Sequence, residues 1–121
     1  MGDAGQPVEQ RLIEQGQLTA VNVLKVGHHG SRSASSMAFL QAVKPQVAVL
    51  SVGAGNRFGL PAPETVARLG SVGSRLYRTD QQGSILISSD GTNLDVSRYT
   101  EENTLVARAR RFILTGSNGL R

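Results

Sequence analysis

The chain has 121 residues, of which 39% are hydrophobic and 4% aromatic, so it suits one domain with a core of Val, Leu, Ile and Ala. It has no cysteine, which excludes disulfides and thiolate zinc sites and leaves His, Asp and Glu as candidate metal ligands. The net charge of +4 tolerates an anionic partner such as nucleic acid. The apolar runs are far shorter than the roughly 20 residues that span a bilayer. We therefore expect a soluble chain without a membrane segment or signal peptide.

Hydrophobic periodicity predicts helices and strands that alternate along the chain. The predicted helices, each opened by a proline or a serine cap, are 8–15, 37–43 and 64–69. An apolar segment rich in β-branched residues predicts a buried strand at 21–26, and a continuous apolar run predicts another at 47–52. A third strand is predicted at 75–79. This alternation argues for an α/β layered domain.

Two antiparallel strands are predicted after this alternating part. Residues 80–83 predict a hairpin turn into a strand at 84–88, and Asp90-Gly91 predicts a second turn into a strand at 93–98. We therefore divide the chain into an α/β part, 1–99, and a basic C-terminal segment, 100–121. We expect that this segment can form a helix around its arginines, Arg108, Arg110 and Arg111.

The two histidines of the chain follow the first predicted strand, in Gly27-His28-His29-Gly30-Ser31. The glycines allow a tight turn that leaves both rings accessible at the sheet edge, where open α/β folds bind their ligands. The alternative is a surface turn that happens to contain histidines. The strand end and the flanking glycines favour the metal site.

Asp3 offers a carboxylate on the loop before the first predicted helix. A carboxylate and an imidazole on successive loops suit a divalent cation, although an aspartate in a turn is a weak signal by itself. Complete domains seldom place chemistry at their first three residues, because termini fray. We therefore expect the chain to be the later part of something larger.

Several segments together resemble one family. Besides Gly2-Asp3 and the His-His-Gly-Ser element, they are Ser51-Val52-Gly53, Asn56-Arg57-Phe58-Gly59 and Tyr77-Arg78-Thr79-Asp80. Over residues 2–91 the chain resembles the metallo-β-lactamase-like domain at the C-terminal end of the ComEC family of bacterial DNA-internalization competence proteins. The resemblance implies the C-terminal half of a four-layer αββα sandwich.

The same resemblance implies a dinuclear metal site, usually zinc, and hydrolysis by a metal-bound hydroxide. Asp3 would be the bridging aspartate, and His28 or His29 would be a ligand of the second metal, with His28 preferred and His29 supporting it. The implied substrate is DNA, on which the domain acts as a nuclease during uptake. The parent family is attached to the bacterial inner membrane.

Two departures from the family argue against activity of this chain alone. The family's early His-x-His-x-Asp-His motif is absent, and the chain has only two histidines. Leu60 and Ala62 stand where the family commonly has histidines, and neither can donate or accept a proton. We expect a fragment of a metal-dependent hydrolase that is inactive alone and holds at most a partial zinc site.

Weaker signals support a second hypothesis, a non-catalytic basic module that binds nucleic acid or another partner on a degenerate version of this fold. Arg57 could contact a phosphate, as could Arg108, Arg110 and Arg111, with solvated arginines as the alternative. A truncated reading frame without an independent role is a third hypothesis. The absent half would leave an apolar sheet face, so we expect a second copy, forming a homodimer, or residues 100–121 to cover it.

Overall fold

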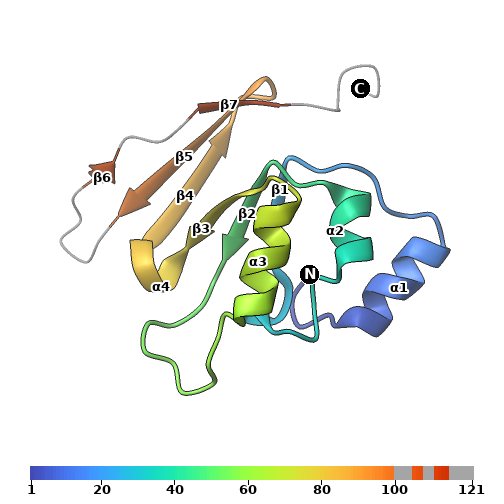
Figure 1. Cartoon of the computed structure of the whole chain (residues 1–121). Coiled ribbons are helices and arrows are strands. Elements are labelled where there is room, and N and C mark those ends of the chain that lie inside the picture. Colours follow the sequence, from blue (N-terminus) through green and yellow to red (C-terminus); the bar gives the residue numbers. More distant parts are fainter. Residues whose placement is uncertain (100–104, 108–110, 115–121) are drawn as a thin grey trace.

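The computed structural model describes residues 1–99, 105–107 and 111–114, which form one layer of helices and two sheets (Figure 1). The helices are α1 (Gln6–Glu14), α2 (Met37–Val43), α3 (Pro63–Ser71) and α4 (Thr79–Gln82), with a 3₁₀ turn over Gly27–Gly30. The strands are β1 (Val23–Lys25), β2 (Val47–Leu50), β3 (Arg75–Arg78), β4 (Ser84–Ser89), β5 (Asn93–Tyr99), β6 (Leu105–Ala107) and β7 (Arg111–Ile113). The fold is therefore α/β, as the sequence predicts.

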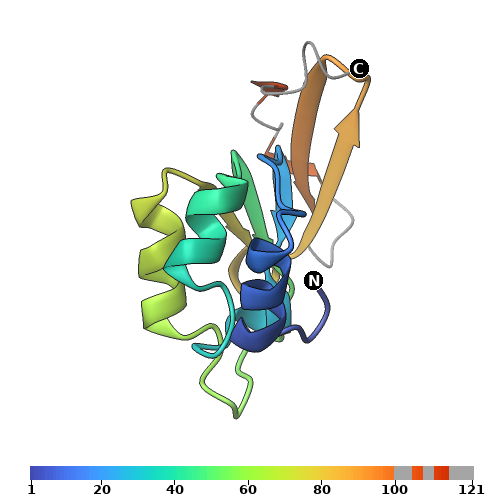
Figure 2. The ribbon, with the colours of Figure 1, turned by 90° about the vertical axis from the view of Figure 1, so that its right-hand side faces the viewer.

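The first sheet is parallel, with the strand order β1-β2-β3. Helices α1, α2 and α3 cover one of its faces (Figure 2). The core between helices and sheet consists of Leu24, Val26, Phe39, Leu40, Val43, Ala48, Leu50 and Leu69. Because this sheet is covered on both faces, its central strand β2 is a continuous apolar run, Val47-Ala48-Val49-Leu50, rather than an alternating one.

The second sheet is antiparallel, and β5 pairs with β4, β6 and β7. It packs on the face of the parallel sheet that the helices leave open (Figure 2). Val47 and Tyr77 of the parallel sheet meet Leu94 and Val96 of β5 in a second apolar cluster. Layers therefore follow in the order helices, parallel sheet, antiparallel sheet.

The structure corrects two local predictions. Residues 80–83 do not form a hairpin turn, because the short helix α4 leads from β3 in one sheet to β4 in the other. The segment 100–121 is not helical where the structure describes it, since β6 and β7 are strands paired with β5. In both places sheet pairing, a non-local interaction, overrides the local pattern.

The apolar face of the parallel sheet is covered within the chain. Strands β4 and β5 provide most of the cover, and Phe112 and Leu114 from the C-terminal segment pack against the same cluster. The expected cover by residues 100–121 is thus found in part, beside a larger contribution from the two preceding strands. Among the described residues, no helix has both the length and the apolar character needed to cross a membrane.

Candidate functional site

The two histidines lie in a strained turn directly after β1. His28 has φ 49° and His29 has φ 53°, so two consecutive side-chain-bearing residues are left-handed. Such conformations cost of order 1–3 kcal/mol each and persist where the surroundings enforce them, often at functional sites. His29 is exposed and His28 is half-buried.

Close packing holds this turn against the N-terminal residues. The backbone N–H of His28 donates to the carbonyl of Gly2 at 2.7 Å, and a Cβ on Gly27 would lie 3.2 Å from the carbonyl oxygen of Ala4. A Cβ on Gly30 would lie 2.6 Å from Leu50 Cδ2. The turn therefore brings the N-terminal loop, which carries Asp3, beside the histidines.

His29 is oriented for a ligand. Its Nδ1 lies 2.7 Å from the carbonyl oxygen of Ser51, and a carbonyl can only accept, so Nδ1 carries the proton. Neutral His29 then has its lone pair on Nε2, which lies 3.9 Å from Oδ1 of Asp3. This distance is too long for a hydrogen bond, but a metal ion could lie between the two atoms.

A buried carboxylate and a half-buried guanidinium hold the segment that follows the histidines. Glu9 is 1% exposed, and its carboxylate accepts from the backbone N–H groups of Ser35 and Ser36. Arg68 of α3 donates to the carbonyl oxygens of Ser35 and Ala34 at 2.9 and 3.1 Å. One carboxylate thus accepts from two backbone N–H groups of this segment, and one guanidinium donates to two of its carbonyls.

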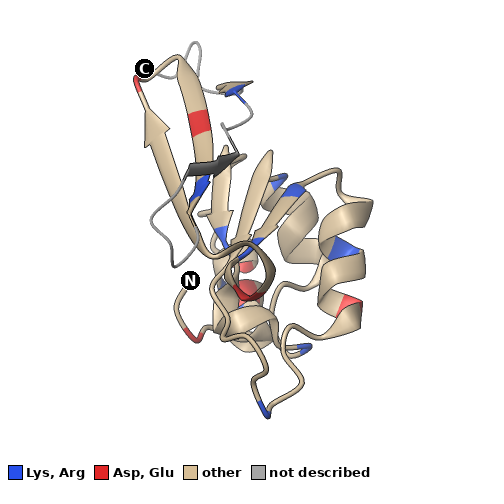
Figure 3. Cartoon of the chain, turned by 90° about the vertical axis from the view of Figure 1, so that its left-hand side faces the viewer, with Lys and Arg blue, Asp and Glu red and all other residues tan. Residues whose placement is uncertain are grey.

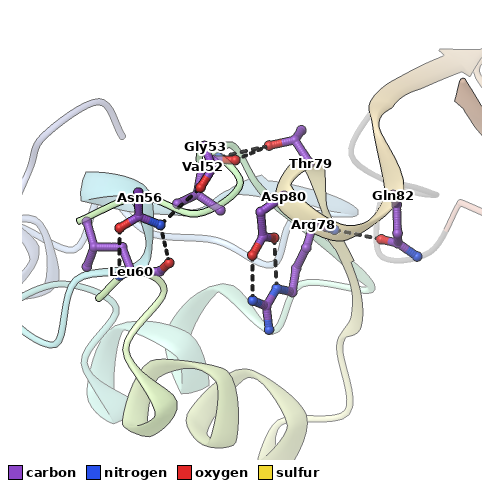
Figure 4. Close-up of polar contacts among 8 residues, drawn as sticks. All are labelled: Val52, Gly53, Asn56, Leu60, Arg78, Thr79, Asp80 and Gln82. Carbon is purple, nitrogen blue, oxygen red and sulfur yellow. Dashed lines mark hydrogen bonds and ion pairs between the residues drawn. The ribbon is translucent and has the colours of Figure 1, made fainter. Parts of the chain in front are cut away.

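The loop after β2 closes the other side of the site. Asn56 Nδ2 donates to the carbonyls of Gly53 and Leu60, and its Oδ1 accepts from the backbone N–H of Leu60 (Figure 4). The same Oδ1 accepts from the backbone N–H of Phe58. The loop is therefore ordered by a single amide side chain.

A pocket of about 380 Å³ lies between this loop and the histidine turn. It is lined by His28, His29, Ser31, Phe58 and Leu60. The pocket combines the two imidazoles and a hydroxyl with two apolar side chains.

Hydrogen bonds also connect the loop after β2 with the start of α4. The hydroxyl of Thr79 exchanges hydrogen bonds of 2.9 Å with the backbone N–H and carbonyl of Val52 (Figure 4). Next to it, Arg78 donates to both oxygens of Asp80, at 3.0 and 2.7 Å. These hydrogen bonds lower the pKa of Asp80 and raise that of Arg78. Asp80 and Arg78 therefore form an ion pair within this turn.

Two of the predicted arginine contacts, Arg57 and Arg111, lie on different elements of the described chain. Arg57 lies on the ordered loop, whereas Arg111 of β7 pairs with Asp95 at 2.9 and 3.0 Å. Arg108 and Arg110 fall outside the described residues. Figure 3 shows Lys and Arg spread over both sheets, the helices and the loops of the described chain, without one concentrated basic face.

The donor set fits part of a metal site. Two ligands of one tetrahedral zinc ion lie about 3.3 Å apart, because zinc–nitrogen and zinc–oxygen distances are near 2.0–2.1 Å. Nε2 of His29 and Oδ1 of Asp3, at 3.9 Å, are about 0.6 Å further apart than that, and the Asp3 side chain is 76% exposed. However, the described residues contain no group of three or more His, Asp or Glu arranged to hold a metal. Asp3 and His29 therefore fit as two ligands of a shell that needs others.

Sequence reasoning missed the roles of Glu9, Arg68 and Phe58. Glu9 stands in the first turn of a predicted helix, where an acidic residue is ordinary, so nothing in the sequence indicated its burial. Arg68 lies in the last turn of α3, where a basic residue is equally ordinary. Phe58 did carry a signal, as an aromatic residue within a loop rich in glycine and proline in a chain poor in aromatics.

Comparison with known proteins finds relatives among bacterial competence proteins. The chain is 36% identical over 84 residues to ComE operon protein 3 of Bacillus subtilis and 38% identical over 85 residues to competence protein ComA of Neisseria gonorrhoeae. It is 32% identical over 97 residues to recombination protein 2 of Haemophilus influenzae. These alignments cover 69%, 69% and 80% of the chain. No protein-family profile and no solved structure matches the chain.

The chain is homologous to a segment of the ComEC family of DNA-internalization competence proteins. The match corresponds to 11–12% of the length of these three relatives.

Proposed function

We propose that the chain is part of a ComEC-like, metal-dependent hydrolase that acts on DNA, and that it supplies two ligands to the metal site. The observation that carries the proposal is the pair formed by Asp3 and His29, in which Ser51 leaves Nε2 of His29 free to face the carboxylate 3.9 Å away. The homology to competence proteins supports DNA as the substrate.

On this proposal the fold is the C-terminal half of a metallo-β-lactamase-like sandwich. The layer order of helices, parallel sheet and antiparallel sheet is compatible with part of an αββα arrangement, with one helix layer still to be added outside the antiparallel sheet. The remaining metal ligands would come from another part of the parent protein. A bound metal would polarise a phosphodiester and lower the pKa of a bound water.

His29, rather than the His28 preferred from sequence, is the proposed ligand. Its ring is exposed, fixed by one hydrogen bond and directed at Asp3. A backbone carbonyl bonded to the other ring nitrogen is the usual support for a metal-ligating histidine. His28 lines the same pocket and is proposed to contact substrate.

A nuclease assay tests this proposal. Alone, the chain should not cleave DNA in the presence of zinc or manganese, because two protein ligands leave the metal shell incomplete. Joined to the part of the parent protein that carries the His-x-His-x-Asp-His motif, it should cleave DNA in a chelator-sensitive reaction. Asp3→Asn and His29→Ala should abolish that cleavage, whereas cleavage that survives both substitutions would contradict the proposal.

The second candidate function is a basic module that binds nucleic acid without a metal. Leu60 beside the histidines favours it, because this side chain offers the pocket no proton donor or acceptor. Salt-dependent DNA binding in chelator, together with no cleavage by the joined protein, would favour this function over the hydrolase.

A further inference from the structure

We propose that Phe58 is a stacking platform for one base of a single-stranded nucleic acid, next to the pocket of the two histidines. Its side chain is 72% exposed, more than any other large apolar side chain among the described residues. An aromatic ring held in water is an unfavourable use of apolar surface unless a partner covers it. The proposal rests on DNA as the substrate of the proposed function and specifies the form in which it binds.

The loop presents Phe58 in a fixed position. Asn56 holds the loop closed by four hydrogen bonds, one of them from the backbone N–H of Phe58 itself at 3.1 Å. The exposure of the ring is therefore a property of an ordered loop, and little conformational entropy is lost when a ligand stacks on it.

Arg57 identifies the chemistry of the partner. Its guanidinium lies 5.4 Å from the centre of the Phe58 ring, within the range of a cation–π contact. An aromatic ring with an arginine over one face can bind a single strand, with a base on its other face and a phosphate on the cation. An apolar peptide would gain nothing from this charge, and the net charge of +4 also favours a polyanion.

The residues that line the pocket indicate where the neighbouring phosphate of a bound strand would lie. Phe58 and Leu60 line its apolar side, and His28, His29 and Ser31 line the rest. A strand with one base on Phe58 can therefore place its next phosphate near the imidazoles. A duplex cannot do so without first unpairing and unstacking a base, which is unfavourable.

Fluorescence anisotropy of a labelled oligothymidylate of about 10 nucleotides, in low salt with EDTA, tests the proposal. Phe58→Ala should weaken binding about tenfold. Leu86→Ala, which removes an exposed side chain from β4, should leave it unchanged. A strand of the same length made of abasic sugar-phosphate should bind wild type and Phe58→Ala equally well, because it keeps the phosphates without the bases.

A second variant follows stacking directly. The chain has no tryptophan, so Phe58→Trp introduces a single indole whose emission should be quenched when the oligothymidylate binds. Equal affinities of wild type and Phe58→Ala for oligothymidylate would overturn the proposal, as would an equal loss on the abasic strand. Failure of the wild type to bind the oligothymidylate at all would overturn it in favour of a protein partner for this ring. The chelator keeps this outcome separate from the metal site, which the nuclease assay with Asp3 and His29 variants tests.

Discussion

At the scale of single residues, the site depends on a backbone conformation that side chains disfavour. His28 and His29 both have positive φ, and the glycines on either side allow the chain to enter and leave this turn. The strain is held by contacts of the turn with Gly2, Leu50 and Ser51. The imidazole of His29 is thus positioned before any ligand binds.

Gly30→Ala tests how tightly this turn is packed. The new methyl group would lie 2.6 Å from Leu50 Cδ2 and 2.7 Å from Pro61 Cβ, at a residue with φ 81°. We expect a loss of about 2–4 kcal/mol in the free energy of unfolding, from overpacking and left-handed strain together. Gly53→Ala is the matched control, since a Cβ there meets nothing within 4 Å. Equal denaturation midpoints for the two variants would contradict this packing.

The sequence predicts the histidine turn but does not distinguish the roles of its two histidines. Gly27 and Gly30 indicate a tight turn with accessible rings, and the structure has one. The choice between His28 and His29 depends on the carbonyl of Ser51, which lies 22 residues further along the chain. Only the pairing of β1 with β2 brings that carbonyl to the ring, and local pattern carries no information about it.

At the scale of elements, α1 and α3 hold the segment 31–36 by one charged side chain each. Glu9→Gln keeps one acceptor oxygen and replaces the other by a donor, so one buried N–H of Ser35 or Ser36 loses its partner. We expect a loss of about 1–3 kcal/mol in the free energy of unfolding by chemical denaturation. Glu14→Gln, at an exposed position of the same helix, should change it by less than about 0.5 kcal/mol. A similar effect of both substitutions would show that the buried carboxylate does not hold this segment.

The turn between β4 and β5 should make stability depend on pH. Asp90 accepts hydrogen bonds from the backbone N–H groups of Asn93 and Thr92, which lowers its pKa from 3.8 to about 2. The folded state therefore favours the ionised form, so the stabilisation is complete above pH 4, approximately, and is lost as the pH falls towards 2. The difference in thermal midpoint between wild type and Asp90→Asn should shrink over that interval. A constant difference from pH 5 to 2 would contradict the lowered pKa.

The local sequence pattern is sufficient to predict where some of the helices begin and end. Helix α2 begins after its predicted serine cap, with Ser36 accepting from Phe39, and ends before Pro45. The passage of the chain from one sheet to the other at α4 could not be predicted. Asp80-Gln81-Gln82-Gly83 is typical of a turn, whether the turn joins two strands of one sheet or strands of two different sheets. What decides it is the packing of Leu94 and Val96 against the parallel sheet, which is a tertiary contact.

At the scale of the whole molecule, contact between the two sheets holds the antiparallel strands in place. Leu94 is 3% exposed in this interface, whereas Leu86, on the neighbouring strand, is 53% exposed. Leu94→Ala should lower the free energy of unfolding by about 2–5 kcal/mol, and Leu86→Ala should change it by less than about 1 kcal/mol. Chemical denaturation of the two variants measures both values. A large effect of Leu86→Ala would indicate that the outer face of the antiparallel sheet is also covered.

The fold class follows from the sequence, but the position of the second sheet does not. Strands that alternate with helices predict an α/β domain with a mixed sheet, and Asp90-Gly91 predicts the turn between the antiparallel strands β4 and β5. The structure has two separate sheets instead, one parallel and one antiparallel. The expected apolar face exists, and it is covered mainly by that pair. Alternation in β4 and β5 indicates that one face of each is buried, without indicating the surface against which it packs.

The most direct test of the central claim is a zinc titration followed by NMR of the imidazole nitrogens, which is simple because the chain has two histidines. We expect Nδ1 of His29 to carry its proton before zinc is added, and Nε2 of His29 to shift on binding. Asp3→Asn should weaken this response, and His28→Ala should preserve it. A response at His28 instead, or none at His29, would contradict a site built on Asp3 and His29.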